Sequence, residues 1–297
     1  MAWYDEDSWA TAAFAPKLST IIVVGLITFL VPIFLHYLAY RRAAASAKAT
    51  KGILLIGPSG AGKTAFLTTA ERKSIAQTHT STAPLTIRAT LPSPHVPASA
   101  AFRAPGDPSF ERARSFNLTD TPGHGKLRRF ATSKLNDTLG LCGIIFVVDA
   151  AYISEDPGLV ETSEYLHDTL LALQKRAASS SKSGREAKEL PVLIAANKLD
   201  LFTALPPHLA KLQLEKAISR VRRSRAKGLK NSGATLSEGD DGGADEESEW
   251  LGEWGEGEFE FTQLEEVGVT VSVAGGNLVG GEKVDVDAWW EWVAERL

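Results

Sequence analysis

The chain has a single cysteine, Cys142, among its 297 residues. One thiol cannot form an intramolecular disulfide, so a disulfide framework is excluded and the folded part is expected in a reducing compartment. Cys142 lies in the apolar run from Leu141 to Val148. That setting favours a small core residue over a reactive thiol.

Neither sign of charge dominates, because 32 Lys and Arg stand against 36 Asp and Glu. This balance argues neither for nor against nucleic acid, and no direct sequence-specific nucleic-acid binding is expected. Residues 211–230 are basic with apolar residues at core spacing, so we expect a helix whose basic face meets solvent or lipid rather than RNA. Residues 238–260 are acidic without a single base, which is typical of a loop or disordered segment.

Charged residues are absent from Leu18 to Tyr40, a run of 23 residues. At 1.5 Å per residue this run makes a helix of roughly 34 Å, enough to cross a bilayer core of about 30 Å. A cleaved signal peptide is the alternative, but the start is acidic and the apolar core is too long. The run therefore predicts a transmembrane helix over 18–40 that contacts the lipid bilayer.

The charges on either side of this run predict its orientation. Arg41, Arg42, Lys48 and Lys51 follow it, whereas Lys17 alone precedes it. Positive residues favour the cytosolic side. We therefore expect residues 1–17 as a lumenal tail, 41–51 as a short tether and 52–297 as a cytosolic domain.

Residues 57–64 read Gly-Pro-Ser-Gly-Ala-Gly-Lys-Thr, a complete phosphate-loop motif between an apolar strand and a helix. Its glycines let several backbone N–H groups face one anion at a helix N-terminus. Lys63 is expected to reach the outer phosphates of a nucleoside triphosphate and the Thr64 hydroxyl to ligate Mg²⁺. The phosphate-binding residues predicted from this motif are Gly57, Ser59, Gly60, Ala61, Gly62, Lys63 and Thr64.

A second motif, Asp120-Thr121-Pro122-Gly123-His124, follows a strand-like stretch from Arg114 to Thr119. Its spacing is that of the D-x-x-G signature of GTP-binding proteins. Asp120 is expected to hold Mg²⁺ through water, and the Gly123 N–H to sense the terminal phosphate.

The third motif, Asn197-Lys198-Leu199-Asp200, ends another buried strand. Asp200 accepts hydrogen bonds from guanine N1–H and its exocyclic amine, and Asn197 contacts O6 and braces the loop. Adenine presents the wrong donor pattern, so the expected ligand is GTP rather than ATP. The last expected strand ends in Ser272, Val273 and Ala274, the place where a GTPase loop backs the guanine.

Strands alternating with helices predict an α/β domain, a doubly wound and mostly parallel phosphate-loop GTPase sheet, preceded by one transmembrane helix. Flexible insertions are expected near 90–113, 177–189 and 230–258. Strands are expected at these ranges: 53–56, 85–90 (an edge), 114–119, 143–149, 191–196 and 267–273.

With its N-terminal apolar run, short tether and motifs GPSGAGKT, DTPGH, NKLD and S-V-A, the chain resembles the beta subunit family of the signal recognition particle receptor. The resemblance covers essentially everything from Thr20 onward. It implies a single-pass protein of the endoplasmic reticulum membrane that binds GTP and Mg²⁺ and holds the N-terminal domain of the receptor alpha subunit through its switch regions. The ribosome and the translocon are further candidate partners.

The resemblance also implies two site residues. The stretch 78–82 is similar to the family's T-x-T-S switch, which points to Thr80 as a Mg²⁺ ligand. His124 stands where Ras-type relatives carry the glutamine that orients the attacking water, so it either positions water or packs at the partner interface.

Three functions compete for this pattern. The first is a GTP-gated receptor subunit with slow or partner-controlled hydrolysis. The second is a turnover GTPase of the Arf or Sar type that times a membrane trafficking event, although those relatives attach through an amphipathic helix or lipid. The third is an ATP-driven membrane enzyme, which Asn197 and Asp200 disfavour.

Overall fold

The structure is a computed structural model of the chain. It divides the chain into two compact units, Met1–Thr50 and Lys51–Leu297. The predicted tail 1–17 and most of the acidic stretch lie outside the described residues. The described residues are 18–48, 51–74, 76–100, 102, 107–137, 140–182, 189–233, 251, 257–279 and 284–297.

The first unit contains α2 (Leu18–Lys48), a single helix of 31 residues with Pro32 inside it. The helix continues through 41–48, which the sequence predicts as a tether, because alanines there favour helix. Nearly all described side chains of α2 are exposed, and Phe29 is 73% exposed. Among the residues that the structure describes, no helix combines the length and apolar content that crossing a membrane requires.

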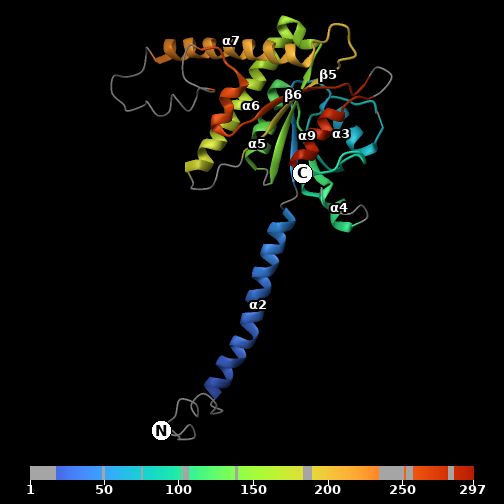
Figure 1. Ribbon diagram of the computed structural model, residues 1–297. Helices are drawn as coiled ribbons and strands as arrows, with labels where there is room; N and C mark the ends of the chain where they lie inside the picture. The colour runs from blue at the N-terminus through green and yellow to red at the C-terminus, as the bar shows by residue number, and fades with distance from the viewer. Residues whose placement is uncertain are drawn as a thin grey trace. The chain divides into compact units, whose positions relative to one another are not determined.

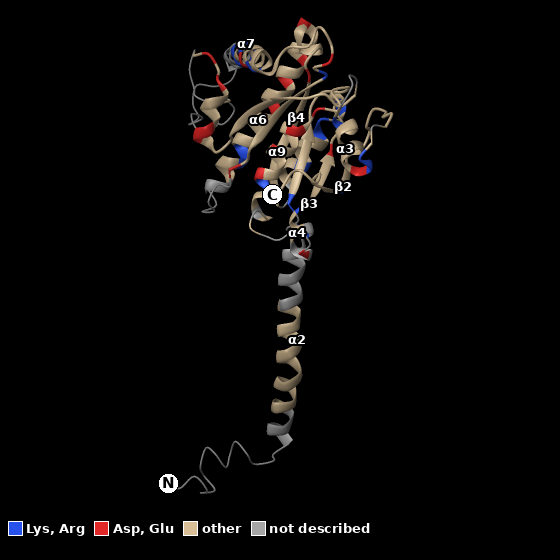
Figure 2. Ribbon diagram, turned by 45° about the vertical axis from the view of Figure 1, so that its right-hand side comes forward, with Lys and Arg blue, Asp and Glu red and all other residues tan. Residues whose placement is uncertain are grey.

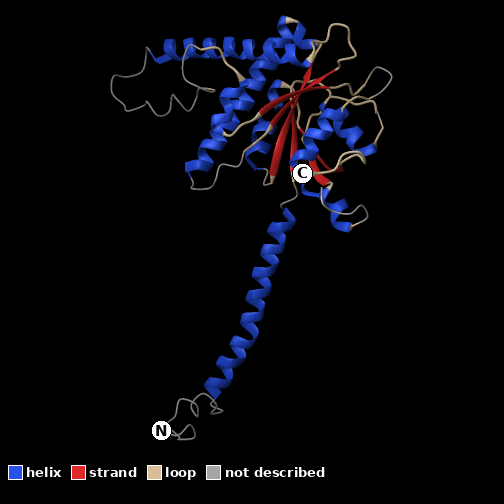
Figure 3. Cartoon of the chain, in the orientation of Figure 1, coloured by secondary structure: helices blue, strands red, loops and turns tan. Residues whose placement is uncertain are grey.

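The second unit is built on one six-stranded sheet in the order β2-β3-β1-β4-β5-β6 (Figures 1 and 3). Only β2 runs antiparallel to its neighbour, and the other pairs are parallel. This confirms the mostly parallel α/β sheet and the edge strand. The strands are β1 (Gly52–Ile56), β2 (Leu85–Thr90), β3 (Ser115–Asp120), β4 (Leu141–Asp149), β5 (Val192–Asn197) and β6 (Val271–Gly275).

Helices cover both faces of the sheet. In Figure 1, α3 (Lys63–Arg72) and α9 (Asp287–Arg296) lie on one side, and α5 (Arg129–Asp137) and α6 (Asp156–Lys182) on the other. The helix α7 (Pro207–Gly233), whose described Lys and Arg are drawn blue in Figure 2, packs on the α5 and α6 side.

Successive residues of each central strand point to opposite faces, so both faces must be apolar. In β1, Leu54 and Ile56 join the core under α5, α6 and α7. Ile53 and Leu55 join the second core, under α3 and α9, where Trp289 is fully buried. The sheet is therefore covered on both sides, as its continuous apolar runs predict.

Two predicted insertions contain ordered structure. The 90–113 stretch holds η1 (Ala98–Ala100) and α4 (Pro108–Ala113), and its Leu91 and Ala100 are buried. The helix α6 continues to Lys182, into the predicted 177–189 loop, because Ala177 and Ala178 are strong helix formers.

Two further expectations need correction. The prediction that the last strand begins at Val267 was wrong, because Phe261–Val267 forms the 3-10 helix η4 and β6 starts at Val271. Cys142 is half-buried at the start of β4 rather than part of the core. By contrast, Phe259 and Phe261 do return to the fold, exposed by only 1% and 2%.

The parallel strands bring the three predicted motifs to one edge of the sheet. Gly57 follows the end of β1, Asp120 ends β3 and Asn197 ends β5. These are the carboxyl ends of neighbouring parallel strands, where α/β sheets bind their ligands.

Candidate nucleotide-binding site

The phosphate loop joins β1 to α3 and depends on glycine at two crowded positions. Gly57 and Gly62 have φ values of 141° and 108°, in the left-handed region. A Cβ at Gly57 would lie 2.2 Å from the Val147 carbonyl oxygen, and one at Gly62 would lie 2.2 Å from Asn197 Nδ2. Any larger residue would push the loop off the edge of the sheet.

Lys63, the first residue of α3, is buried with 6% of its surface exposed. Its Nζ donates hydrogen bonds to the carbonyl oxygens of Gly57 (2.8 Å) and Pro58 (2.7 Å). Burial lowers the pKa of Lys63 to about 8, while the charge of Asp120 raises it and that of Arg128 lowers it. A buried cation held only by neutral carbonyls favours an anionic ligand.

Three side-chain oxygens meet beside this lysine. Thr64 Oγ1 donates to Asp120 Oδ2 at 2.7 Å, and Ser81 Oγ lies 2.8 Å from each of them. The other carboxylate oxygen, Asp120 Oδ1, is buried and without a hydrogen-bond partner. The three residues come from α3, the 76–84 loop and β3, so the cluster ties three segments together.

These residues fit Mg²⁺, which prefers hard oxygen ligands and keeps several waters or phosphate oxygens. Within the described ranges, no three His, Cys, Asp or Glu side chains form a group able to hold a metal by themselves. The cluster itself offers one carboxylate and two hydroxyl groups, which leaves coordination positions for phosphate oxygens and water.

A cavity of about 250 Å³ opens beside the oxygen cluster. Residues of the phosphate loop, of the 78–81 stretch and of the second motif line it, and they include Lys63 and several residues with side-chain hydroxyls. The lining residues are Ser59, Gly60, Gly62, Lys63, Thr64, Ala65, Thr78, His79, Thr80, Ser81 and Gly123.

Gly123 packs directly on the phosphate loop. A Cβ there would lie 2.5 Å from the Gly57 carbonyl oxygen and 2.6 Å from the Ser59 nitrogen. The next residue, His124, is exposed, and its Nδ1 accepts a 3.4 Å hydrogen bond from the Lys126 N–H. The structure thus brings Gly123 to the cavity and leaves the His124 ring in solvent.

The predicted base-binding residues lie at the ends of β5 and β6. Asn197 is buried, and its Nδ2 donates to the Ala61 carbonyl at 2.8 Å while its Oδ1 accepts from the Leu278 N–H at 3.2 Å. Lys198 has a left-handed φ of 65° and binds Asp149 Oδ2 at 2.5 Å. Asp200 is exposed.

Ser272, Val273 and Ala274 lie within β6, the last strand of the sheet. They pair with β5, and Gly275 is opposite Ala196. The loop that follows carries Gly276, whose carbonyl accepts from the Leu199 N–H at 3.4 Å. The structure therefore brings the third motif and the end of β6 together.

Two residues of this site were missed in the sequence. Ser81 lies next to the predicted Thr80, and residues 80–82 all carry hydroxyls, so no sequence signal separates them. Asp149 ends the apolar run of β4, and an acid at such a strand end is a recognisable signal. Its Oδ1 also accepts from the Ala151 and Tyr152 N–H groups, both at 3.1 Å.

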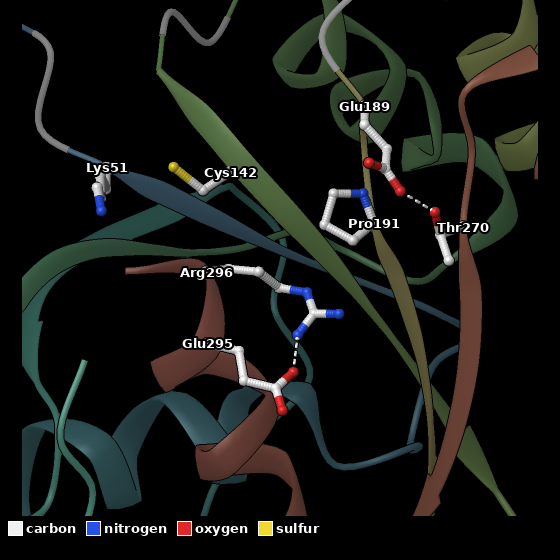
Figure 4. Close-up of a pocket in the computed structure, with 7 residues that line it drawn as sticks. All are labelled: Lys51, Cys142, Glu189, Pro191, Thr270, Glu295 and Arg296. Atoms are coloured by element: carbon white, nitrogen blue, oxygen red, sulfur yellow. Dashed lines mark hydrogen bonds and ion pairs between the residues drawn. The ribbon is translucent and has the colours of Figure 1, made fainter. Parts of the chain in front are cut away.

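A larger cavity, of about 520 Å³, lies elsewhere (Figure 4). Its lining includes Lys51, Cys142 and Pro191, at the amino ends of β1, β4 and β5. It is therefore at the opposite edge of the sheet from the three motifs, and the chemistry rather than the size identifies the smaller cavity as the candidate site.

A mostly parallel sheet with a glycine-rich phosphate loop after β1 and an oxygen cluster beside its lysine defines the class of phosphate-loop proteins with a GTPase-like fold. The family described as signal recognition particle receptor beta subunit matches residues 48–269. Signal recognition particle receptor subunit beta of Saccharomyces cerevisiae is 32% identical over 251 residues, which are 82% of this chain and 84% of the yeast protein. The chain belongs to the signal recognition particle receptor beta subunit family.

Solved structures agree with this assignment. The signal recognition particle receptor SRb-GTP/SRX complex from Chaetomium thermophilum matches with a TM-score of 0.65 and 34% identity, covering 83% of this chain and 100% of that chain. The SRb-GDP-Mg structure from the same organism matches with a TM-score of 0.58 and 35% identity, over 84% and 98% of the two chains.

Proposed function

We propose that this chain binds GTP with Mg²⁺ and, in that state, holds the N-terminal domain of the receptor alpha subunit at the endoplasmic reticulum membrane for co-translational protein targeting. The observation that carries the proposal is the oxygen cluster of Thr64, Ser81 and Asp120 beside the buried Lys63. Support comes from the Chaetomium relatives, whose structures are described with GTP and SRX and with GDP and Mg.

The phosphates fit the cavity between the phosphate loop and Gly123. Lys63 would exchange its two carbonyl partners for phosphate oxygens, and the loop N–H groups would hold the same anion. Bound Mg²⁺ would neutralise phosphate charge, with Thr64 as a ligand, Asp120 acting through water and a hydroxyl of the 78–81 stretch completing the protein share. Thr80 remains a candidate for that last role beside Ser81.

Guanine selectivity rests on Asp200 and Asn197, with Lys198 covering the base and Ser272–Ala274 behind it. The contacts of Asn197 with Ala61 and Leu278 support this placement, because they fix the third motif against the phosphate loop. Asp200 is exposed in this structure, which leaves its carboxylate accessible to a ligand.

The nucleotide would act as a switch because two loops meet at the cavity. The 76–84 loop contributes Ser81 and the 120–128 segment contributes Gly123. A terminal phosphate would fix both, and its loss would release both, changing the surface offered to the alpha subunit.

Hydrolysis is expected to be slow or controlled by the partner. No arginine is among the described residues lining the phosphate cavity, so the described part of the chain places no arginine finger there for the transition state. His124 is the candidate to orient water, although its exposed ring equally suits a partner contact.

The membrane anchor is proposed from the uncharged run of 18–40. A helix that is apolar all round requires apolar surroundings, and the described apolar side chains of α2 are exposed. The basic residues after the run favour a lumenal N-terminus and a cytosolic GTPase domain. Protease added outside sealed microsomes should remove the domain and leave a small protected N-terminal fragment, whereas full protection of the domain would reverse the orientation.

The decisive test of function is the affinity of the alpha subunit's N-terminal domain for the full chain in nanodiscs, with a non-hydrolysable GTP analogue and with GDP. We expect binding with the analogue and loss with GDP, and Thr64→Asn should abolish the analogue-dependent binding. Equal affinity in both states would indicate a constitutive scaffold. Rapid repeated turnover with release of the partner would favour an Arf-like or Sar-like timer.

A further inference from the structure

The segment 120–128 is fixed at both ends. At its start, the buried Thr121 hydroxyl donates to the Leu55 carbonyl at 2.7 Å, and Gly123 packs on the phosphate loop. At its end, Arg128 lies between the 3-10 helix η2 (Gly125–Leu127) and α5. A displacement of Gly123 is therefore confined to the few residues between Gly123 and Arg128.

Arg128 is attached to α6 by two different contacts. Its Nη2 lies 2.9 Å from Glu161 Oε1, and its guanidinium carbon lies 4.3 Å from the centroid of the Tyr165 ring. Its Nε is buried without a hydrogen-bond partner. The Arg128 side chain is 22% exposed and that of Glu161 is 43% exposed, so the ion pair alone contributes little and the stacking adds to it.

The α6 side of this attachment is itself held in place. Tyr165 is 3% exposed and meets Phe146 of β4 in an edge-on contact with ring centroids 5.6 Å apart. The second oxygen of Glu161 accepts from the Tyr152 hydroxyl at 3.4 Å. Arg128 is therefore bound to a surface fixed to the central sheet.

Between the two fixed ends, His124, Gly125 and Lys126 are exposed. A displacement of the Gly123 end, with Arg128 held, must appear as a change in the shape of this exposed span. Arg128 also bears on the site electrostatically, because its charge contributes to lowering the pKa of Lys63.

We propose that Arg128 is a positioning residue: by binding Glu161 and Tyr165 it fixes the far end of the 120–128 segment, so that the nucleotide state changes the exposed surface of residues 124–127. The inference rests on the proposed function, because it explains how a change of bound nucleotide alters the surface that binds the alpha subunit. Arg128 is not among the residues lining the phosphate cavity, so it acts through the segment rather than on the phosphates.

The test is the affinity of the alpha subunit's N-terminal domain for the full chain in nanodiscs, with GTP analogue and with GDP, for Arg128→Gln, Arg128→Lys and Glu161→Gln. Arg128→Gln, which removes both the ion pair and the stacking, should reduce the ratio of the two affinities by about tenfold. Glu161→Gln keeps the stacking on Tyr165, and Arg128→Lys keeps the charge but not the planar stacking group, so both should fall between Arg128→Gln and the original protein. The affinity for the nucleotide itself should change by less than about twofold.

The matched control is Arg129→Gln, which removes an exposed arginine at the adjacent position and should leave the ratio unchanged. A charge exchange, Arg128→Glu with Glu161→Arg, should recover part of the ratio that either single reversal loses, which a general loss of stability would not do. If the original protein shows no preference between GTP analogue and GDP, the proposed function fails. If it shows the preference and Arg128→Gln and Glu161→Gln keep it in full, the positioning role of Arg128 is overturned.

Discussion

The side-chain amide of Asn197 donates a 2.8 Å hydrogen bond to the backbone carbonyl of Ala61, joining the third motif to the phosphate loop. The same side chain accepts from the Leu278 N–H at 3.2 Å. Asn197 is 2% exposed, so both partners would be left in a dry environment without it. Its nitrogen also occupies the space that a side chain at Gly62 would need.

Asn197→Ala should therefore destabilise the fold even without nucleotide. Leaving a buried carbonyl and a buried N–H unpaired costs about 1–3 kcal/mol each, so the free energy of unfolding should fall by roughly 2–6 kcal/mol in urea titrations. Gln213→Ala, which removes an exposed amide on α7, is the control and should stay within about 0.5 kcal/mol. Equal stability of the two variants would mean that Asn197 serves the ligand alone.

Asp200→Asn should change base selectivity instead of stability, because Asp200 is exposed. The substitution reverses part of the donor and acceptor pattern at the base edge, so GTP should bind more weakly and xanthosine triphosphate more tightly. Each mismatched polar contact costs about 1–3 kcal/mol. Fluorescent-nucleotide competition measures both affinities, and a protein that binds ATP and GTP equally before mutation would remove the basis for guanine recognition.

The affinity for GTP should fall as the pH rises above 8. Burial lowers the pKa of Lys63 to about 8 in the ligand-free protein, so above that pH the amine is mostly neutral and phosphate binding must take up a proton. Between pH 7 and 9 the affinity should fall roughly tenfold. In Lys63→Arg the guanidinium stays charged, and this pH dependence should disappear, even if the affinity itself is lower.

The same lysine gives a stability effect of opposite sign. An unfolded chain keeps the lysine near its ordinary pKa of 10.5, so it binds more protons than the folded chain between pH 8 and 10.5. The contribution of Lys63 to the free energy of unfolding therefore rises with pH over that window in the absence of nucleotide. A binding affinity that is flat between pH 7 and 9 would contradict the environment described for Lys63.

The sheet could be predicted from the sequence because each strand is marked by a short continuous stretch of apolar residues. The apolar runs at 53–56 and 143–149 are too continuous for strands with a solvated face, and they predict the buried parallel strands β1 and β4. Each motif then follows a strand end, so parallel pairing alone brings Asp120, Asn197 and the phosphate loop to one edge. No tertiary detail was needed for that step.

Other features depend on contacts that no local pattern encodes. Cys142 lies in an apolar run, yet as the second residue of β4 it is half-exposed. The attachment of Arg128 to Tyr165 joins residues of different elements, and neither belongs to a motif.

The hydroxyl that approaches Asp120 could not be assigned from the sequence either, because Thr78, Thr80 and Ser81 lie close together in one loop. Ser81 Oγ lies 2.8 Å from both Thr64 Oγ1 and Asp120 Oδ2, whereas Thr80 is exposed. A shift of one residue in an extended loop turns the next side chain to the opposite side, so only one of the two adjacent hydroxyls can face the cluster at a time.

Ser81→Ala should therefore raise the Mg²⁺ concentration required for GTP binding more than Thr80→Ala does. Loss of one metal-facing hydroxyl at about 1–2 kcal/mol corresponds to roughly a tenfold higher Mg²⁺ concentration for half-maximal binding. Titrating Mg²⁺ against a fixed concentration of labelled GTP analogue measures this, with Thr78→Ala as the control from the same loop. If Thr80→Ala shows the larger shift, the loop moves by one residue when the nucleotide binds, and Thr80 is the metal ligand in that state as the family resemblance implies.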